Sequence, residues 1–467
     1  MLSQKKRLYT VLEVKKRELD SRLYFAVKAA ERGFSTVISK KNNLNNKVDL
    51  MKTGILLDKS LGPKHLKPIL KFKKAGHRVC SFDEEGLLFY NPETLCKSRM
   101  APDCLNEIDY FFCWGENDRN AILNYCTLDP AKVIKTGNCR IDFLKGRLKN
   151  ILTEDAKKIK KKYGKFILCN TNFSYVNYQS PSENIKTIID SYKILGKRDD
   201  QTLEVDKKKL NVQMETRKKL LEFFKIFSER FPDKKILIRA HQSENVEYWN
   251  ESLKSYKNIN LVKDHSTSAA TWMLASELNI STNCTTGVES KILNTLTFNY
   301  LPVKEDISYY NLPNKINKNI SSNEELLLEL EKLYSNQVYE KNFDTDKINY
   351  IKKYIYNADS NIDSAEIMLN FLDKVSDNLI IVNEADKKSN FLYNNFFKLE
   401  RYIKNLYHKT KKNSLSNTMY DLYLRKNPGW DFNEVKNRIL KIAETLNIEN
   451  LKVFEIYPNM ICIEKNN

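Results

Sequence analysis

Three consecutive carboxylates, Asp83, Glu84 and Glu85, follow an apolar segment and precede Gly86. The segment Arg78–Phe82 has the composition of a buried strand, so we expect the carboxylates at its carboxyl end. Neighbouring carboxylates repel one another, which raises at least one pKa and suits a general base that takes a proton from a hydroxyl group. A solvated acidic turn is the alternative interpretation. Asp83, Glu84 and Glu85 are therefore all candidates for a catalytic residue.

Two polar segments in the second half of the chain have the composition of a phosphate site. Arg239 and His241 follow the strand-like run Lys235–Ile238, and such a donor pair at a strand end can hold an anion. A hydroxyl-rich turn follows the run Leu278–Ser281 and opens a helical pattern, which is the arrangement that points backbone N–H groups at a phosphate. The candidates in this second segment are Asn283, Thr285, Thr286, Gly287 and Glu289. A core or turn histidine and ordinary helix capping are the alternatives.

Two further strand ends carry polar candidates. Arg17 and Arg22 lie in a charged segment after the run Leu8–Val14, and a guanidinium can grip a carboxylate. A charged, solvated loop is the alternative here. Asn172 follows the run Phe166–Asn170 and faces the same cleft if the two halves of the chain oppose each other.

The elements that must position these residues alternate between strand and helix patterns. In the first part of the chain, strands are predicted at Leu8–Val14, Ser35–Ser39, Thr53–Leu57, Arg78–Phe82, Asp109–Trp114 and Lys132–Thr136. In the second part, they are predicted at Phe166–Asn170, Lys235–Ile238, Ile259–Val262, Leu278–Ser281 and Leu296–Tyr300. Strands that alternate with helices form parallel, doubly wound sheets, so the pattern predicts two α/β domains.

The lysine-rich segment Ile151–Gly164 has no strand pattern and is the predicted domain boundary. We expect an N-terminal acceptor-side domain at 1–155, a nucleotide-binding domain at 156–345 and a helical C-terminal extension at 346–467. The extension has helical patterns at Asp346–Tyr356, Ala365–Val375, Phe391–Tyr407 and Phe432–Leu446. The third of these joins an apolar stripe to basic residues, which predicts either packing on a domain or contact with an anionic membrane surface.

The amino-acid composition limits which classes of ligand and which cellular location are expected for the protein. The chain of 467 residues is too long for a single core of ordinary size, and its net charge of +19 favours anionic ligands. The basic residues form no known nucleic-acid-binding pattern, so we predict no nucleic-acid partner. Nine cysteines without a Cys-x-x-Cys pair and five scattered histidines argue against a disulfide framework and a zinc site. No signal peptide or long apolar run is recognised, which predicts a cytoplasmic protein, with the inner face of the cytoplasmic membrane as its place of contact if the stripe binds lipid.

The chain resembles bacterial surface-carbohydrate biosynthesis proteins over roughly residues 7–305. The resemblance rests on EVKKRELDSR at 13–22, LLDKSL at 56–61, FDEEG at 82–86, CWGE at 113–116, TGNCRID at 136–142, FILCNTNF at 166–173, RAHQSEN at 239–245 and STNCTTGVE at 281–289. These proteins include sialyltransferase-like enzymes of the GT-B type, in which two Rossmann-like domains face a cleft. Their donors are CMP-activated 3-deoxy-2-ulosonic acids such as Kdo or sialic, legionaminic and pseudaminic acid.

The resemblance implies a role for each motif. An acidic pair followed by glycine acts on the acceptor hydroxyl, and it maps to Glu84, Glu85 and Gly86. The resemblance thus implies Glu85 as the catalytic base or acid, with Glu84 and Asp83 as the next candidates. A His-Pro motif contacts the CMP phosphate, and it maps to His241, although Gln242 stands where proline is expected. A Ser/Thr pair maps to Thr285 and Thr286.

The resemblance also implies a cation for the donor carboxylate, for which Arg17, Arg22, Lys59 and Arg239 are the candidates. It implies transfer to a capsule or lipopolysaccharide precursor with no metal or other cofactor. A GT-B transferase with a UDP-sugar, GDP-sugar or CDP-polyol donor, and a non-catalytic protein that binds anionic glycans, are the alternatives.

Overall fold

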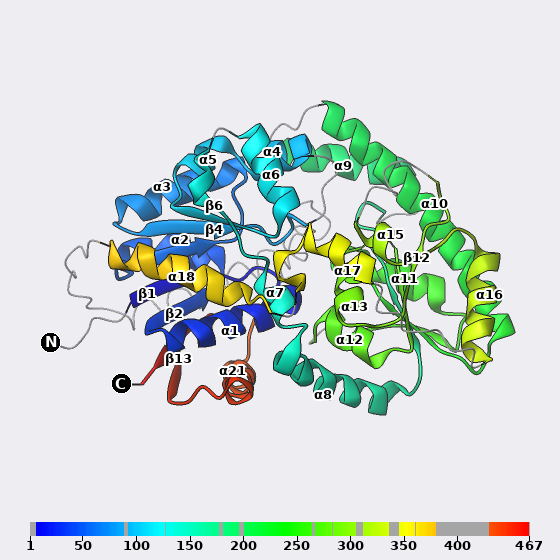
Figure 1. Cartoon of the computed structure of the whole chain (residues 1–467). Helices are drawn as coiled ribbons and strands as arrows, with labels where there is room; N and C mark the ends of the chain where they lie inside the picture. The colour runs from blue at the N-terminus through cyan, green and yellow to red at the C-terminus, as the bar shows by residue number, and fades with distance from the viewer. Residues whose placement is uncertain are drawn as a thin grey trace, which may run out of the picture. The chain divides into compact units, whose positions relative to one another are not determined.

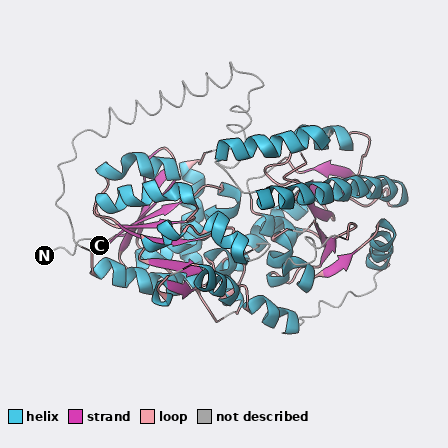
Figure 2. Ribbon diagram, turned by 90° about the horizontal axis from the view of Figure 1, so that it is seen from above, coloured by secondary structure: helices cyan, strands magenta, loops and turns pink. Residues whose placement is uncertain are grey.

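The computed structural model describes residues 6–87, 92–126, 128–176, 181–195, 200–263, 267–282, 284–304, 312–335, 345–359, 361–379 and 429–466. The chain divides into two compact units (Figure 1). Unit 1 comprises Met1–Ile151 and Lys352–Asn467, and unit 2 comprises Leu152–Ile351. In both units the strands form a central sheet with helices packed against it (Figure 2).

Unit 1 contains an eight-stranded sheet in the order β13-β14-β2-β1-β3-β4-β5-β6. Its parallel strands are β1 (Lys6–Val11), β2 (Phe34–Ser39), β3 (Ile55–Asp58), β4 (Arg78–Phe82), β5 (Tyr110–Cys113) and β6 (Val133–Lys135). All six lie within the predicted segments or within two residues of them. β2 and β3 are buried along their whole length, as expected for parallel strands that are covered on both faces. Because β1 lies between β2 and β3, the direction of chain crossover reverses at β1 and β3, where such sheets bind ligands.

The connections of unit 1 are mostly helical. They comprise α1 (Lys15–Glu31), α2 (Lys41–Lys47), α3 (Leu66–Lys74), α4 (Pro92–Arg99), α5 (Pro102–Asn106), α6 (Glu116–Tyr125) and α7 (Cys139–Asp142), with short 3-10 turns at η1 (Val48–Leu50), η2 (Pro63–His65) and η3 (Pro130–Lys132). The helix α8 (Gly146–Tyr163) covers the predicted boundary segment, so the chain passes between the units as a helix.

The C-terminal part of the chain returns to unit 1. The turn η4 (Tyr356–Ala358) is followed by the helices α18 (Ser364–Asp377) and α21 (Phe432–Leu446), and both helices agree with predicted helical segments. Two strands come after them, β13 (Leu451–Tyr457) and β14 (Met460–Lys465). β14 pairs antiparallel with β2 and extends the sheet. The described part of 346–467 therefore differs from a separate helical extension, because it adds strands and belongs to unit 1. The predicted helix at Phe391–Tyr407, with its basic apolar stripe, lies outside the described residues.

Unit 2 contains a six-stranded parallel sheet in the order β12-β11-β10-β7-β8-β9. Its strands are β7 (Ile167–Asn170), β8 (Ile236–Arg239), β9 (Ile259–Leu261), β10 (Leu278–Ser281), β11 (Thr297–Tyr300) and β12 (Lys318–Ile320). Numbered in chain order these strands run 6-5-4-1-2-3, which is the Rossmann arrangement, and the crossover reverses between β7 and β10.

The helices of unit 2 cover this sheet. They are α9 (Pro181–Leu195), α10 (Asp200–Arg230), α11 (Val246–Leu253), α12 (Ala269–Ala275), α13 (Thr286–Ile292), α15 (Leu312–Ile316), α16 (Asn323–Tyr334) and α17 (Thr345–Lys352), whose last residue falls in unit 1. In the long helix α10, Leu220, Phe223, Phe224 and Phe227 form a buried stripe at helical spacing. No helix among the described residues combines the length and the apolar character that a membrane span needs.

Candidate functional site

The acidic turn after β4 places its three carboxylates in three different environments. Asp83 is buried and accepts two hydrogen bonds from the Arg99 guanidinium, at 2.5 and 2.6 Å. It also accepts the backbone N–H of Glu85 at 3.0 Å, while its own carbonyl accepts the Trp114 indole N–H at 2.5 Å. With these contacts Asp83 holds the turn in shape, and its carboxylate is not exposed to a substrate.

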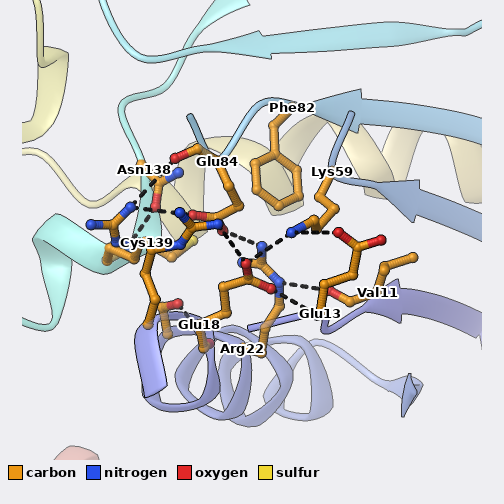
Figure 3. A network of polar contacts seen from close by, with 12 residues as sticks. Val11, Glu13, Glu18, Arg22, Lys59, Phe82, Glu84, Asn138 and Cys139 are labelled. Atoms are coloured by element: carbon orange, nitrogen blue, oxygen red, sulfur yellow. Dashed lines mark hydrogen bonds and ion pairs between the residues drawn. The ribbon is translucent and has the colours of Figure 1, made fainter. Parts of the chain in front are cut away.

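Glu84 is also buried, in a cationic surrounding (Figure 3). Its carboxylate forms an ion pair with Arg22, and the Arg140 guanidinium lies 3.6 Å away. Arg22 is itself buried, donates its Nε–H to the Val11 carbonyl at 3.2 Å and lies 4.4 Å from the centre of the Phe82 ring. Arg22 therefore balances the buried charge of Glu84, which is what a buried carboxylate requires.

Glu85 is the exposed member of the triplet, with 52% of its side chain accessible. Its two carboxylate oxygens bind Arg17 Nη1 at 3.1 Å and Arg99 Nη1 at 3.0 Å. Partial burial by itself would raise the pKa of Glu85, but the charges of Arg17 and Arg99 outweigh that effect and lower the pKa to about 2. Glu85 is therefore ionised at neutral pH, and it is a weak base as long as both guanidinium groups hold it.

A buried ion network fills the crossover point of the unit 1 sheet, at the ends of β1 and β3. Glu18, in the first turn of α1, accepts the backbone N–H groups of Glu13 at 2.9 Å and Val14 at 3.2 Å. Its other oxygen accepts Lys59 Nζ at 2.8 Å and Arg17 Nη2 at 3.0 Å, and Lys59 also pairs with Glu13 at 3.0 Å (Figure 3). Burial by itself raises the pKa of Glu18. The charges of Lys59 and the neighbouring arginines have the larger, opposite effect and lower the pKa, so the carboxylate stays ionised.

This network separates the cations that the sequence analysis grouped together. Arg22 and Lys59 are buried and bound to internal carboxylates, whereas Arg17 also reaches the exposed Glu85. Arg99 shares that carboxylate and was not predicted, because it lies on α4 and no motif marks it. Glu18 was also missed, although an acidic residue in the first turn of a helix is a recognisable capping signal.

The loop after β6 is joined to the returning C-terminal segment. Gly137 has a φ of 79°, and the fully buried Asn357 lies against it. The Asn357 side chain accepts the Asn138 N–H at 3.0 Å and donates to the Asn138 carbonyl at 2.9 Å and to Asp142 Oδ1 at 2.6 Å. Arg140, in the same loop, donates to the Glu84 carbonyl at 3.4 Å. The segment after Lys352 thus fixes the loop that brings Arg140 to the acidic turn.

In unit 2, polar residues form a row across the carboxyl end of the sheet. The pairing of neighbouring strands places them side by side in the order Arg239 (β8), Asn170 (β7), Ser281 (β10), Asn299 (β11) and Asn319 (β12). Residues at one level of a parallel sheet point to the same face, so this row forms a polar edge at the crossover point. Within the described residues, three buried atoms of the row have no hydrogen-bond partner: Arg239 Nε, Asn170 Oδ1 and Asn299 Oδ1.

A buried carboxylate, Glu244, joins the two loops beside this edge. It accepts the backbone N–H groups of Phe173 and His241, both at 3.0 Å, and the Thr171 hydroxyl at 2.8 Å. Its second oxygen accepts the Trp249 indole N–H at 2.8 Å. Desolvation raises the pKa of Glu244, against the effect of these hydrogen bonds. Glu244 stands in the motif RAHQSEN, but no role for it was predicted, because its partners come from other segments of the fold.

His241 follows β8, and its ring is held in one orientation. Its Nδ1 lies 2.6 Å from the Ser243 hydroxyl and accepts the Ser243 backbone N–H at 3.4 Å. A backbone N–H can only donate, so Nδ1 is the acceptor and the proton of the neutral ring is on Nε2. The imidazole can therefore offer a hydrogen-bond donor at the sheet edge.

The turn after β10 lies at the same edge. The Thr282 hydroxyl accepts the Asn172 N–H at 2.9 Å, which bridges β10 and β7 across the crossover point. Thr286 is buried, 3.5 Å from the Ser281 hydroxyl, and Thr285 is partly exposed at the start of α13. Desolvation lowers the pKa of Arg239, and the negative charge of Glu289 opposes this effect in part. Asn283 lies outside the described residues.

Close packing explains why a glycine stands at position 287. A Cβ at this position would lie 3.1 Å from Pro313, 3.2 Å from Asn299 and 3.2 Å from Asn317. The Gly287 carbonyl accepts the Asn317 amide at 2.8 Å. Gly287 was a candidate for the phosphate site, and in the structure the lack of a side chain at this position allows α13 to pack closely against its neighbours.

Comparison with known proteins shows the class of fold. No family model and no curated protein matches the chain by sequence. The structure is similar to the UDP-GlcNAc 2-epimerase of Neisseria meningitidis bound to UDP-GlcNAc, with a TM-score of 0.50 and 13% identity over 79% of this chain and 100% of that chain. It is also similar to the UDP-GlcNAc 2-epimerase of Methanocaldococcus jannaschii in complex with UDP-GlcNAc and UDP, with a TM-score of 0.50 and 16% identity over 79% of this chain and 99% of that chain. A third similar structure is a variant of the wall teichoic acid polymerase TagF soaked with CDPG, with a TM-score of 0.51 and 12% identity over 80% of this chain and 90% of that chain. The chain thus has the GT-B-type fold, with two Rossmann-like α/β domains.

Proposed function

We propose that the chain is a GT-B transferase that takes its transferred group from a nucleotide-linked donor. In this proposal unit 2 holds the donor phosphate at the carboxyl ends of β8 and β10, with Arg239, His241 and the Thr285–Thr286 turn. The observation that carries the proposal is the buried Arg239 Nε, which within the described residues has no hydrogen-bond partner. A buried, unpaired donor on a guanidinium is costly, and a phosphate oxygen would satisfy it.

The fold comparisons support the same donor class. The two epimerase structures contain UDP-GlcNAc, and the TagF structure was soaked with CDPG. In Rossmann-type sheets such ligands bind at the crossover point, which in unit 2 is the β7–β10 edge that carries Asn172 and Thr282.

The motifs make the donor more specific. We propose a CMP-linked 3-deoxy-2-ulosonic acid, which is Kdo or a nonulosonic acid such as sialic, legionaminic or pseudaminic acid. The acceptor is a hydroxyl group of a capsule or lipopolysaccharide precursor. Glu85 supports this proposal because it is the exposed carboxylate of its turn and the charges of Arg17 and Arg99 keep it ionised.

In this proposal the protein supplies a general base for the acceptor hydroxyl and groups that stabilise the leaving phosphate. Glu85 takes the proton of the acceptor hydroxyl as its oxygen attacks the anomeric carbon, and the bond from that carbon to the CMP phosphate breaks. Negative charge develops on the phosphate, where Arg239 and the His241 Nε2–H stabilise it. Arg239 supplies the positive charge that a metal ion would otherwise supply, and His241 adds a hydrogen bond, so we propose transfer that needs no metal.

The direct test is nucleotide binding by the full chain and three variants. Isothermal titration with CMP, CDP, UDP and GDP ranks the donors, and we expect CMP to bind most tightly. Arg239→Gln and His241→Ala should each weaken binding about tenfold or more, because charge-assisted hydrogen bonds contribute roughly 1.5–3 kcal/mol. Arg230→Gln is the matched control, since Arg230 is half-exposed on α10 and pairs with Glu331.

Each outcome assigns the donor or rejects the site. Tightest binding of CDP would favour a polyol-phosphate transferase, which the likeness to TagF makes the second candidate. Tightest binding of UDP or GDP would favour a neutral nucleotide sugar. Undiminished CMP affinity in the Arg239→Gln variant would reject the phosphate site.

A further inference from the structure

We propose that Arg17 and Arg99 form a binding site for a substrate carboxylate, and that Glu85 occupies this site in the unliganded protein. The assignment of the ligand to a sugar acid rests on the proposed function. The binding site itself rests on the geometry of unit 1.

Both guanidinium groups are fixed from behind by buried carboxylates. Arg17 Nη2 binds Glu18 at 3.0 Å, and Arg99 binds Asp83 through Nε and Nη2. The side chains of Glu18 and Asp83 are 0% and 1% exposed, so these anchors are inaccessible to a ligand. The remaining terminal nitrogen of each arginine, Nη1, binds the exposed Glu85.

The geometry of the present occupant indicates the class of ligand. Glu85 Oε1 lies 3.1 Å from Arg17 Nη1, and Oε2 lies 3.0 Å from Arg99 Nη1, so each oxygen of one planar carboxylate takes one arginine. A substrate carboxylate can reproduce both contacts of Glu85.

The occupant is also the group that is easiest to displace. Arg17 and Arg99 are 23% and 27% exposed, whereas the Glu85 side chain is 52% exposed on a turn. Exposed ion pairs of this kind contribute little to stability, typically about 0–1 kcal/mol each. An incoming carboxylate therefore competes with a weakly held internal one.

Displacement has a chemical consequence for Glu85. The charges of Arg17 and Arg99 are the main causes that lower its pKa to about 2, with a smaller effect from Lys59, and the substrate would neutralise the two arginine charges. Glu85 would then be released as a stronger base, beside the group that has just been bound. Binding of the acidic substrate and activation of the base are in this way one event.

The test is carboxylate binding measured without any nucleotide. The probes are N-acetylneuraminate, its methyl ester and D-glucuronate, titrated calorimetrically into the full chain. We expect Glu85→Gln to bind N-acetylneuraminate or D-glucuronate roughly fivefold more tightly than the unmodified protein, which corresponds to about 1 kcal/mol. Arg17→Gln and Arg99→Gln should each lose most of the affinity, and the methyl ester should bind no variant better than another.

Two residues on the surface of unit 1, the partly exposed Glu107 and the exposed Arg78, provide matched controls. Glu107→Gln removes a carboxylate that pairs with Lys73, and Arg78→Gln removes a guanidinium that pairs with Asp109. Neither change should alter carboxylate affinity. Should the arginine variants fold poorly, Glu85→Gln carries the test by itself, because a merely structural Glu85 would not compete with ligand.

The arms of the experiment separate the two sources of the carboxylate. Preference for N-acetylneuraminate assigns the site to the donor sugar, and preference for D-glucuronate assigns it to an acidic acceptor. Unchanged or weaker carboxylate binding by Glu85→Gln, or equal binding of inorganic phosphate, would overturn the proposal. The proposed nucleotide site is tested by other variants, so either proposal can fail alone.

Discussion

The contact between Gly137 and Asn357 gives the sharpest stability prediction. A Cβ at position 137 would lie 1.9 Å from Asn357 Oδ1, so Gly137→Ala must displace the asparagine. Its three hydrogen bonds, to Asn138 N–H, the Asn138 carbonyl and Asp142, would be lost together. At about 1 kcal/mol for each bond, the displacement costs roughly 3 kcal/mol. The strain of alanine at positive φ adds about 1–2 kcal/mol.

Gly33 provides the matched control in the same unit. Its φ is 83° against 79° at Gly137, but nothing lies within 4 Å of the position of its Cβ. Gly33→Ala therefore has the backbone strain alone, and the difference between the two variants isolates the contact with Asn357. In a thermal unfolding experiment Gly137→Ala should melt about 6–12 °C below Gly33→Ala, at roughly 2–4 °C for each kcal/mol.

A double mutant checks the cause of this effect. If the contact is responsible, Asn357→Ala should cost much less in the Gly137→Ala background than alone, because the same hydrogen bonds cannot be lost twice. Equal melting temperatures for Gly137→Ala and Gly33→Ala would refute the reasoning, and so would additive effects in the double mutant.

Three further predictions concern buried and exposed carboxylates. Glu84→Gln leaves the buried Arg22 without an anionic partner and should destabilise unit 1 by about 3–5 kcal/mol in urea unfolding, whereas Glu85→Gln should cost less than about 1 kcal/mol. The pKa of Glu85 is lowered from 4.5 to about 2, so its stabilising effect is present above pH 4.5 and is lost as the pH falls towards 2. Glu85→Gln should therefore flatten the decline of the unfolding midpoint in that range, and an unchanged slope would contradict the assignment. Glu244→Ala should lower both the melting temperature and the nucleotide affinity, since it leaves several buried donors unpaired, while Glu247→Ala, at an exposed position, should change neither.

Much of the fold could be predicted from the sequence because its parallel strands are short apolar runs that are buried on both faces. β4 and β10 have the predicted bounds, and the other central strands differ by one to three residues at an end. The strands β12, β13 and β14 were missed. β12 has three residues, and β13 is an edge strand with only its last residue buried. β14 is buried, yet its place beside β2 depends on a contact between opposite ends of the chain, which no local pattern reports.

The candidate site shows a similar division. Strand ends and glycines predicted where polar residues would gather, and in unit 2 the candidates at β8 and β10 do lie along one sheet edge. The burial and the ion-pair partners of each side chain were not predictable, because they depend on residues from other helices and strands. Asp83 and Glu85 both bind Arg99 of α4, while Glu84 binds Arg22 of α1. A motif that reads as three equivalent carboxylates is therefore two buried structural acids and one exposed acid.

The most direct test of the account is a crystal structure of the chain soaked with CMP. The account predicts a phosphate oxygen within hydrogen-bonding distance of Arg239 Nε, with the His241 Nε2–H as a second donor. It also predicts that the nucleotide lies at the β7–β10 edge of unit 2. A well-ordered CMP bound elsewhere, with Arg239 Nε still unpaired, would contradict the central claim.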